Sequence, residues 1–127
     1  MTDPRIDPRI DPNCIFCKIA RGQIPAKKIY DDDEVMAFHD IRPQAPVHFL
    51  LVPKAHIATL YDAAPGHYAA LGKLLGLAGR LAREAGATDG FRAIINNGRV
   101  GHQEVYHVHM HVLGGPEALG PMLSKRI

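Results

Sequence analysis

The stretch His107-Val-His-Met-His-Val112 decides the fold, because histidines alternate with apolar residues along it. Such alternation predicts a β-strand, in which successive side chains point to opposite faces of a sheet. We expect the strand to run over residues 105–113 and to end at Gly114-Gly115-Pro116. Its three histidines would share one face, with backbones roughly 6.6 Å apart at a rise of about 3.3 Å per residue. The valines and the methionine would face the core.

The segments outside this strand predict an α+β domain with an antiparallel sheet of about five strands, one long helix and one short helix. Further strands are expected over residues 34–41, 48–52 and 91–95, and a short helical turn over residues 15–20. The long helix is expected between Pro65 and Gly86, where apolar residues recur at three- and four-residue intervals. Its expected apolar face consists of Tyr68, Leu71, Leu75, Ala78 and Ala82.

Length and composition restrict the function. The 127 residues suit one domain, which we assign to residues 13–127, and the repeated Asp-Pro-Arg-Ile of residues 1–12 predicts a flexible N-terminal tail. The 15 Lys and Arg against 13 Asp and Glu form no basic stripe, so we expect no nucleic-acid partner. No apolar run approaches the roughly 20 residues that cross a bilayer, and the N-terminus is unlike a signal peptide. We therefore expect a cytoplasmic protein without a membrane partner.

Three imidazoles on one strand face can act on a ligand in two ways. In one, they bind a catalytic Zn²⁺ that holds a reactive water, with Glu104 as the carboxylate base nearest in sequence. In the other, one imidazole attacks phosphorus, the remaining ones position the phosphate oxygens or the leaving group, and a backbone carbonyl could fix the tautomer of the attacking ring. The segments Asn96-Asn-Gly98 and Gly101-His-Gln-Glu104 favour the second mechanism, since amides and N–H groups can cradle an anion.

The stretch His107-Val-His-Met-His-Val-Leu-Gly-Gly115 resembles the signature of the histidine triad (HIT) superfamily. Resemblance to its nucleoside phosphoramidase branch covers nearly everything except residues 1–12. The other motifs that carry it are Ile15-Phe16, Ile24-Pro25-Ala26, Ala37-Phe-His-Asp-Ile41, Pro43-Gln-Ala-Pro-Val-His48, Val52-Pro-Lys54, Gln103-Glu-Val-Tyr106 and Leu119-Gly-Pro-Met-Leu123.

The resemblance implies a HIT-like fold and a homodimer whose central strands join across the two chains. It also implies a purine nucleotide substrate and a catalytic mechanism that requires no cofactor. His109 would be the nucleophile, His111 and His48 would bind phosphate oxygens or assist the leaving group, and His107 completes the triad. Asp40 would bind the ribose hydroxyls, although a strand-end cap is its alternative role. The implied pocket walls are Ile15, Phe16, Phe38, His39, Ile41 and Leu50, and the implied contacts to phosphate or leaving group are Asn96, Gln103 and Glu104.

Two departures from the family pattern lie just before the histidine strand. His102 stands where most relatives have Gly, and Glu104 stands where several have a hydroxyl residue, so the amine preference of relatives does not transfer. The resemblance implies a purine nucleoside 5′-phosphoramidate hydrolase that forms a nucleotidyl-histidine intermediate. A dinucleoside polyphosphate hydrolase and a non-catalytic purine nucleotide-binding regulator remain alternatives.

The two cysteines provide a candidate metal site. Cys14 and Cys17 could complete a Cys₂His₂ set for structural zinc with His56 and His107, and some superfamily members resemble this arrangement. His107 would then belong to the metal and not to the reaction. Two inert thiols at the start of a helix are the alternative, and it stays open.

Overall fold

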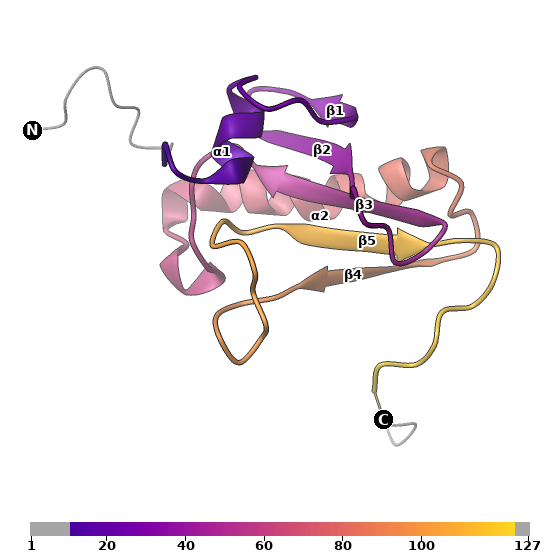
Figure 1. Ribbon diagram of the computed structural model, residues 1–127. Coiled ribbons are helices and arrows are strands. Elements are labelled where there is room, and N and C mark those ends of the chain that lie inside the picture. The colour runs from indigo at the N-terminus through magenta and orange to yellow at the C-terminus, as the bar shows by residue number, and fades with distance from the viewer. Residues whose placement is uncertain (1–10, 124–127) are drawn as a thin grey trace, which may run out of the picture.

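A computed structural model of the protein describes residues 11–123, so most of the expected N-terminal tail lies outside the described residues. The described chain forms one five-stranded antiparallel sheet in the order β1-β2-β3-β5-β4 (Figure 1). The strands are β1 (Lys28–Asp31), β2 (Val35–His39), β3 (Val47–Pro53), β4 (Phe91–Ile95) and β5 (Met110–Gly114). The helices are α1 (Ile15–Ala20), α2 (Tyr68–Glu84) and two 3-10 turns, η1 (Leu60–Asp62) and η2 (Pro65–His67). The predicted α+β fold is confirmed.

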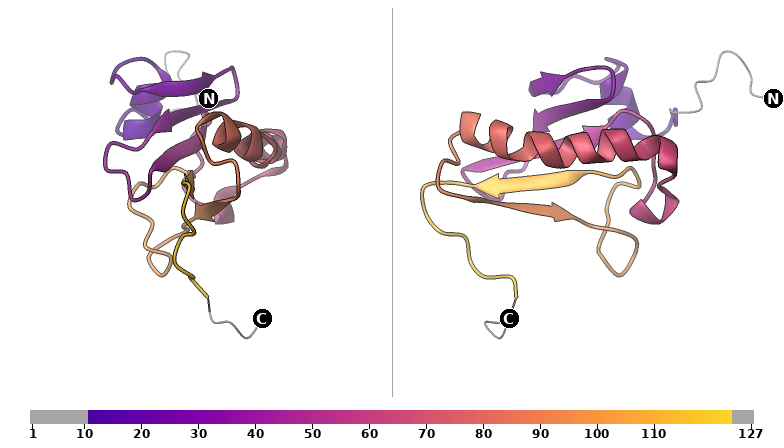
Figure 2. Two further views of the ribbon diagram at one scale, coloured as in Figure 1. Left: turned by 90° about the vertical axis from the view of Figure 1, so that its right-hand side faces the viewer. Right: turned by 180° about the vertical axis from the view of Figure 1, so that it is seen from behind.

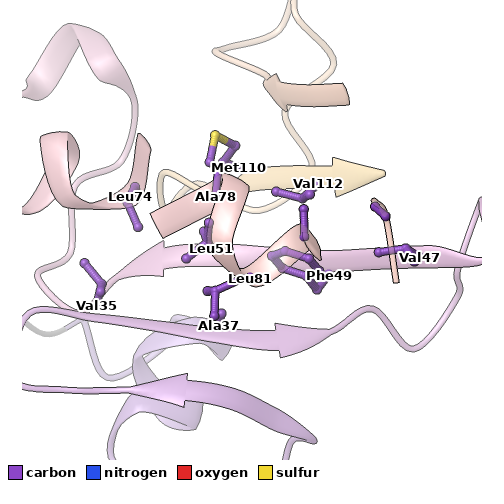
Figure 3. Packing of buried hydrophobic residues seen from close by; sticks show 12 residues of the cluster. Val35, Ala37, Val47, Phe49, Leu51, Leu74, Ala78, Leu81, Met110 and Val112 are labelled. Carbon is purple, nitrogen blue, oxygen red and sulfur yellow. The ribbon is translucent and has the colours of Figure 1, made fainter. Parts of the chain in front are cut away.

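The two α-helices cover opposite faces of the sheet. Figure 2 shows the long helix α2 against one face, and α1 lies on the other face. Phe49, Leu51, Met110 and Val112 project from β3 and β5 into the α2 core (Figure 3). A second cluster joins α1 to the opposite face through residues such as Phe16, Phe38 and Leu50. Helix α1 therefore lies over the face from which the histidines project.

The apolar face of α2 was predicted only in part. Ala78 and Ala82 are buried as expected and Leu71 packs against the core, whereas Tyr68 and Leu75 are 61% and 64% exposed. Leu74 and Leu81 are buried instead, so the helix was predicted correctly and its buried face lies slightly to one side of the expected one. Apolar residues surround much of this helix, and only the position of the sheet decides which of them are buried.

The histidine strand starts later than its alternation predicts. The ladder of β5 begins at Met110, which pairs with Leu51 of β3 and Ile95 of β4. Continuation of the β3 register would bring Val108 opposite Pro53, which has no N–H to donate. Instead, the N–H of Val108 donates to the carbonyl of Ile57 at 2.7 Å. The expected strand start at Val105 is therefore wrong, although Met110 and Val112 do face the α2 core as predicted.

Strand β1 was not anticipated, because it is four residues long, only partly buried and interrupted by a register shift between Lys28 and Tyr30.

None of the helices within residues 11–123 is both long and apolar enough to cross a membrane.

Candidate active site

Four histidines lie on the α1 side of the sheet: His48 of β3, and His107, His109 and His111 of the histidine segment. The ring centroids of His109 and His111 are 5.1 Å apart, and those of His111 and His48 are 5.2 Å apart. Phe16 of α1 meets the ring of His109 edge-to-face at 5.0 Å and that of His107 at 5.8 Å. The sequence prediction that the triad shares one face is thus consistent with these contacts.

The backbone determines the tautomer of His109. Its Nδ1 lies 2.7 Å from the carbonyl oxygen of His107. A carbonyl can only accept, so Nδ1 carries the hydrogen and Nε2 of the neutral ring holds a lone pair. This is the carbonyl contact that the nucleophile hypothesis requires. The His109 ring can present Nε2 as a nucleophile without a separate base to remove its proton.

His48 and His111 form a hydrogen-bonded pair on adjacent strands. Nε2 of His48 lies 2.9 Å from Nδ1 of His111 and 3.4 Å from Oδ2 of Asp40. The backbone N–H of Gln44 donates to Nδ1 of His48 at 3.0 Å. Burial lowers the pKa of His48 below its usual 6.5, although the Asp40 carboxylate opposes the shift. Burial, and then the neighbouring His109 and His48, also lower the pKa of His111.

His107 belongs to a different cluster from the other two triad members. Its Nε2 lies 2.6 Å from the carbonyl oxygen of Pro53, so Nε2 carries the hydrogen and Nδ1 holds the lone pair. That Nδ1 lies 3.4 Å from Sγ of Cys14, 3.5 Å from Sγ of Cys17 and 3.2 Å from Nδ1 of His56. Burial lowers the pKa of His107 to about 4, so its ring is neutral near pH 7.

The spacing within this cluster fits a tetrahedral zinc ion. Bonds of about 2.3 Å to sulfur and about 2.0–2.1 Å to nitrogen separate two nitrogens by roughly 3.3 Å, and sulfur from nitrogen by roughly 3.5 Å. The observed separations are 3.2 Å between the nitrogens and 3.4–3.5 Å between sulfur and nitrogen. Outer contacts are present as well, because the Pro53 carbonyl holds His107 and Oδ2 of Asp11 lies 3.8 Å from Nε2 of His56.

The residues expected to form the nucleoside pocket are brought together only in part. Phe16 and Phe38 are in contact, with ring centroids 5.7 Å apart, and Leu50 is buried in the same cluster. Ile15 is 45% exposed on α1, whereas His39 and Ile41 are exposed at the end of β2. Oδ1 of Asp40 accepts from the backbone N–H of Arg42 at 2.8 Å, so the strand-end cap exists and Oδ2 faces His48.

The loop that precedes the histidines is held together by Gln103. Its amide nitrogen donates to the carbonyls of Ala58 and Val105 at 2.7 and 3.0 Å, and its Oε1 accepts from the N–H of Gly98 at 2.8 Å. Both amide hydrogens are thus engaged by the protein, and the expected contact of Gln103 with phosphate stays a prediction. Asn96 is half-buried directly after β4, and Glu104 is exposed.

Residues 101 and 102 shape the same loop. A Cβ on Gly101 would lie 2.6 Å from the Asn97 carbonyl oxygen, so the close approach requires glycine there. His102 has a φ of 59°, in the left-handed region that favours glycine. The departure from the family pattern at residue 102 therefore places a strained residue beside the site.

The partners that fix the histidine rings were not identified from the sequence. They are the N–H of Gln44 and the carbonyl of Pro53, and the carboxylate of Asp11 lies near His56, at 3.8 Å, without a hydrogen bond. The first two are backbone groups, which carry no side-chain signal in a sequence. The carboxylate of Asp11 lies within the segment expected to be a flexible tail.

Fold and site together define a small α+β protein whose sheet gathers three histidines of one segment and a fourth from the neighbouring strand. Residues 21–118 match the HIT domain family, and the chain belongs to that family. It is 50% identical over 113 residues to the purine nucleoside phosphoramidase of Escherichia coli K12, covering 88% of this chain and 94% of that protein. The expected family is confirmed.

Two solved structures extend the comparison. A HIT family hydrolase from Legionella pneumophila superposes with a TM-score of 0.80 at 46% identity, covering 86% of this chain and 98% of that one. A zinc-bound histidine triad family protein from Mycobacterium smegmatis superposes with a TM-score of 0.72 at 37% identity, covering 90% of this chain and 81% of that one.

We predict that His48 and His111 titrate below pH 6.5 in the folded protein. As pH falls, the unfolded chain binds protons on these rings at a higher pH than the folded chain does. The contribution of the two rings to stability is therefore present above pH 6.5 and is lost as pH falls below it. Proton NMR titration of the two rings, compared with the urea-unfolded protein, measures the shift. Midpoints at or above those of the unfolded protein would contradict the prediction.

Proposed function

We propose that the protein hydrolyses purine nucleoside 5′-phosphoramidates at the P–N bond, with His109 as the nucleophile. The observation that carries this proposal is the hydrogen bond from Nδ1 of His109 to the His107 carbonyl, which leaves the Nε2 lone pair available. The neutral pair of His48 and His111 lies beside it and can hold the phosphate oxygens. The 50% identical Escherichia coli relative named purine nucleoside phosphoramidase supports the same reaction.

The proposed reaction has two displacement steps. In the first, the Nε2 lone pair of His109 forms a bond to phosphorus, while the leaving amine keeps the electron pair of the P–N bond and takes up a proton from solvent. The intermediate is a nucleotidyl-imidazolium with phosphorus on Nε2 and hydrogen on Nδ1. The positive ring is stabilised by the His107 carbonyl at 2.7 Å. In the second, water attacks phosphorus and loses a proton to solvent, and the electron pair of the P–Nε2 bond returns to His109.

The ring orientations speak against a catalytic zinc held by the whole triad. Nδ1 of His109 and Nε2 of His107 both donate to backbone carbonyls, and the lone pair of His107 is directed at Cys14 and Cys17. Three imidazoles of one zinc site would each direct a lone pair at the same point.

Phe16, Phe38 and Asp40 are proposed to bind the nucleoside.

The variant His109→Asn should lose turnover of an adenosine 5′-phosphoramidate by about 10⁴-fold or more, the scale expected when a covalent nucleophile is removed. The control His67→Asn changes a histidine on η2 and should retain the wild-type rate. Steady-state kinetics of amine release measures both. Turnover by His109→Asn would remove His109 as the nucleophile, and AMP binding without turnover by wild type would favour a nucleotide-binding regulator. Faster cleavage of a dinucleoside polyphosphate than of the phosphoramidate would favour the alternative function, a dinucleoside polyphosphate hydrolase.

We infer that Cys14, Cys17, His56 and His107 bind a structural zinc ion. The match between their spacing and tetrahedral geometry carries this inference, and the zinc-bound relative from Mycobacterium smegmatis supports it. Burial raises the pKa of the Cys17 thiol to about 11, and a bound metal would replace its proton. The ion would connect the start of α1 with residue 107. A reducing cytoplasm would keep both thiols available, consistent with the expected location.

Zinc removal should lower the melting temperature by about 10 °C or more, since a ligand at 1,000 times its Kd stabilises by about 4 kcal/mol. Zinc content by elemental analysis should be one ion per chain in wild type and in His67→Asn, and should be lost in Cys17→Ser. A chelator that removes zinc without changing the wild-type melting temperature would contradict a structural role.

We also infer that the chain forms a homodimer through β4. This strand is an edge of the sheet, and the hollow beside it is lined by one cation, Arg92, and by the apolar residues Ala93, Ile94, Ile95, Met122 and Leu123. Within residues 11–123 no further strand pairs with this mostly apolar edge, which is suited to pairing with a second copy.

Sedimentation velocity should give wild type twice the 13.9 kDa mass of one chain. Ala93→Lys places a charge at an exposed position of β4 and should shift the mass toward one chain, whereas Ala69→Lys at an exposed position of α2 should not. A monomeric wild type would refute the dimer, and a dimeric Ala93→Lys would refute the β4 interface.

A further inference from the structure

The backbone N–H of Gln44 fixes the hydrogen position on His48. Gln44 lies between β2 and β3, and its N–H donates to Nδ1 of His48 at 3.0 Å. The ring nitrogen that accepts this bond must hold a lone pair. Neutral His48 therefore carries its single hydrogen on Nε2.

The neighbours of Nε2 agree with this tautomer. Nδ1 of His111 lies 2.9 Å away and Oδ2 of Asp40 lies 3.4 Å away, and both can accept. If Nε2 of His48 held a lone pair, it would face the Asp40 carboxylate without a hydrogen between them. The Nε2–H of His48 therefore donates to Nδ1 of His111, and the hydrogen of neutral His111 resides on Nε2.

We propose that Gln44 is a positioning residue, whose backbone N–H determines through His48 that His111 presents its Nε2–H to the phosphate. His48 is 5% exposed, so few waters compete with the Gln44 N–H for its Nδ1. The tautomers follow from the hydrogen bonds alone, and only their use on phosphate rests on the proposed function.

The same hydrogen bond argues against a metal ion beside the nucleophile. Asp40, His48 and His111 bring three ligand atoms within 4.8 Å of one another, which resembles a metal site. A metal would need a lone pair on Nε2 of His48 and hence a hydrogen on Nδ1, which would face the Gln44 N–H. In the cysteine cluster, by contrast, the Pro53 carbonyl leaves Nδ1 of His107 free to bind metal. The backbone thus favours metal in the cysteine cluster and disfavours it at the phosphate-binding pair.

Nitrogen-15 NMR of the zinc-loaded wild-type protein at pH 7 tests the tautomers directly. We expect the hydrogen on Nε2 in both His48 and His111, with a scalar coupling between Nε2 of His48 and Nδ1 of His111 across their hydrogen bond. A hydrogen on Nδ1 of His48 would overturn the proposal. A second equivalent of zinc that shifts the His48 and His111 resonances would overturn the metal argument.

Two substitutions at residue 44 separate the backbone from the side chain. Gln44→Ala keeps the N–H and should preserve the tautomers and kcat, whereas Gln44→Pro removes the N–H. In Gln44→Pro the His48 resonances should show a mixture of tautomers, and kcat should fall by about 10- to 100-fold, as when an outer partner of a functional histidine is lost. Unchanged tautomers in a folded Gln44→Pro would overturn the proposal. If Gln44→Pro does not fold, the nitrogen-15 spectrum of the wild type still tests the tautomers of His48 and His111. That test does not depend on phosphoramidase turnover by the wild type.

Discussion

A neutral imidazole has one hydrogen and two nitrogens, and the site depends on backbone groups that decide which nitrogen carries it. The Pro53 carbonyl assigns the hydrogen of His107 to Nε2, and the His107 carbonyl assigns that of His109 to Nδ1. The two rings are only two residues apart, yet the lone pair is on Nδ1 in His107 and on Nε2 in His109. One lone pair faces the cysteines, and the other belongs to the proposed nucleophile.

His107 connects these two chemistries. Its ring joins the cysteine cluster, while its carbonyl accepts a hydrogen bond from the proposed nucleophile, so a metal ion that fixes His107 would also fix the orientation of His109. The Pro53 carbonyl is available to the His107 ring because the N–H of Val108, which would lie opposite Pro53 in a continued ladder, donates to the carbonyl of Ile57 instead. The late start of β5 is thus linked to the orientation of His107.

The sequence predicted the parts of the fold that depend on local pattern. It located α1 at residues 15–20 and β4 at residues 91–95, and it indicated a set of metal ligands whose atoms do converge. For α2 it placed Ala78 and Ala82 correctly but chose Leu75 in place of Leu74, because the two leucines are chemically equivalent until the sheet is in place. The role of Gln44 was also beyond sequence reasoning, since any residue except proline supplies the same N–H.

The proposed mechanism requires that Nε2 of His109 forms a bond to phosphorus during turnover. Rapid mixing of wild-type protein with an adenosine 5′-phosphoramidate, an alkaline quench and intact mass spectrometry would detect the adduct, and peptide mapping would locate it. We expect a transient mass increase of one adenylyl group on His109, formed and lost at rates compatible with turnover. Turnover without any adduct, or an adduct on another histidine, would contradict this role of His109.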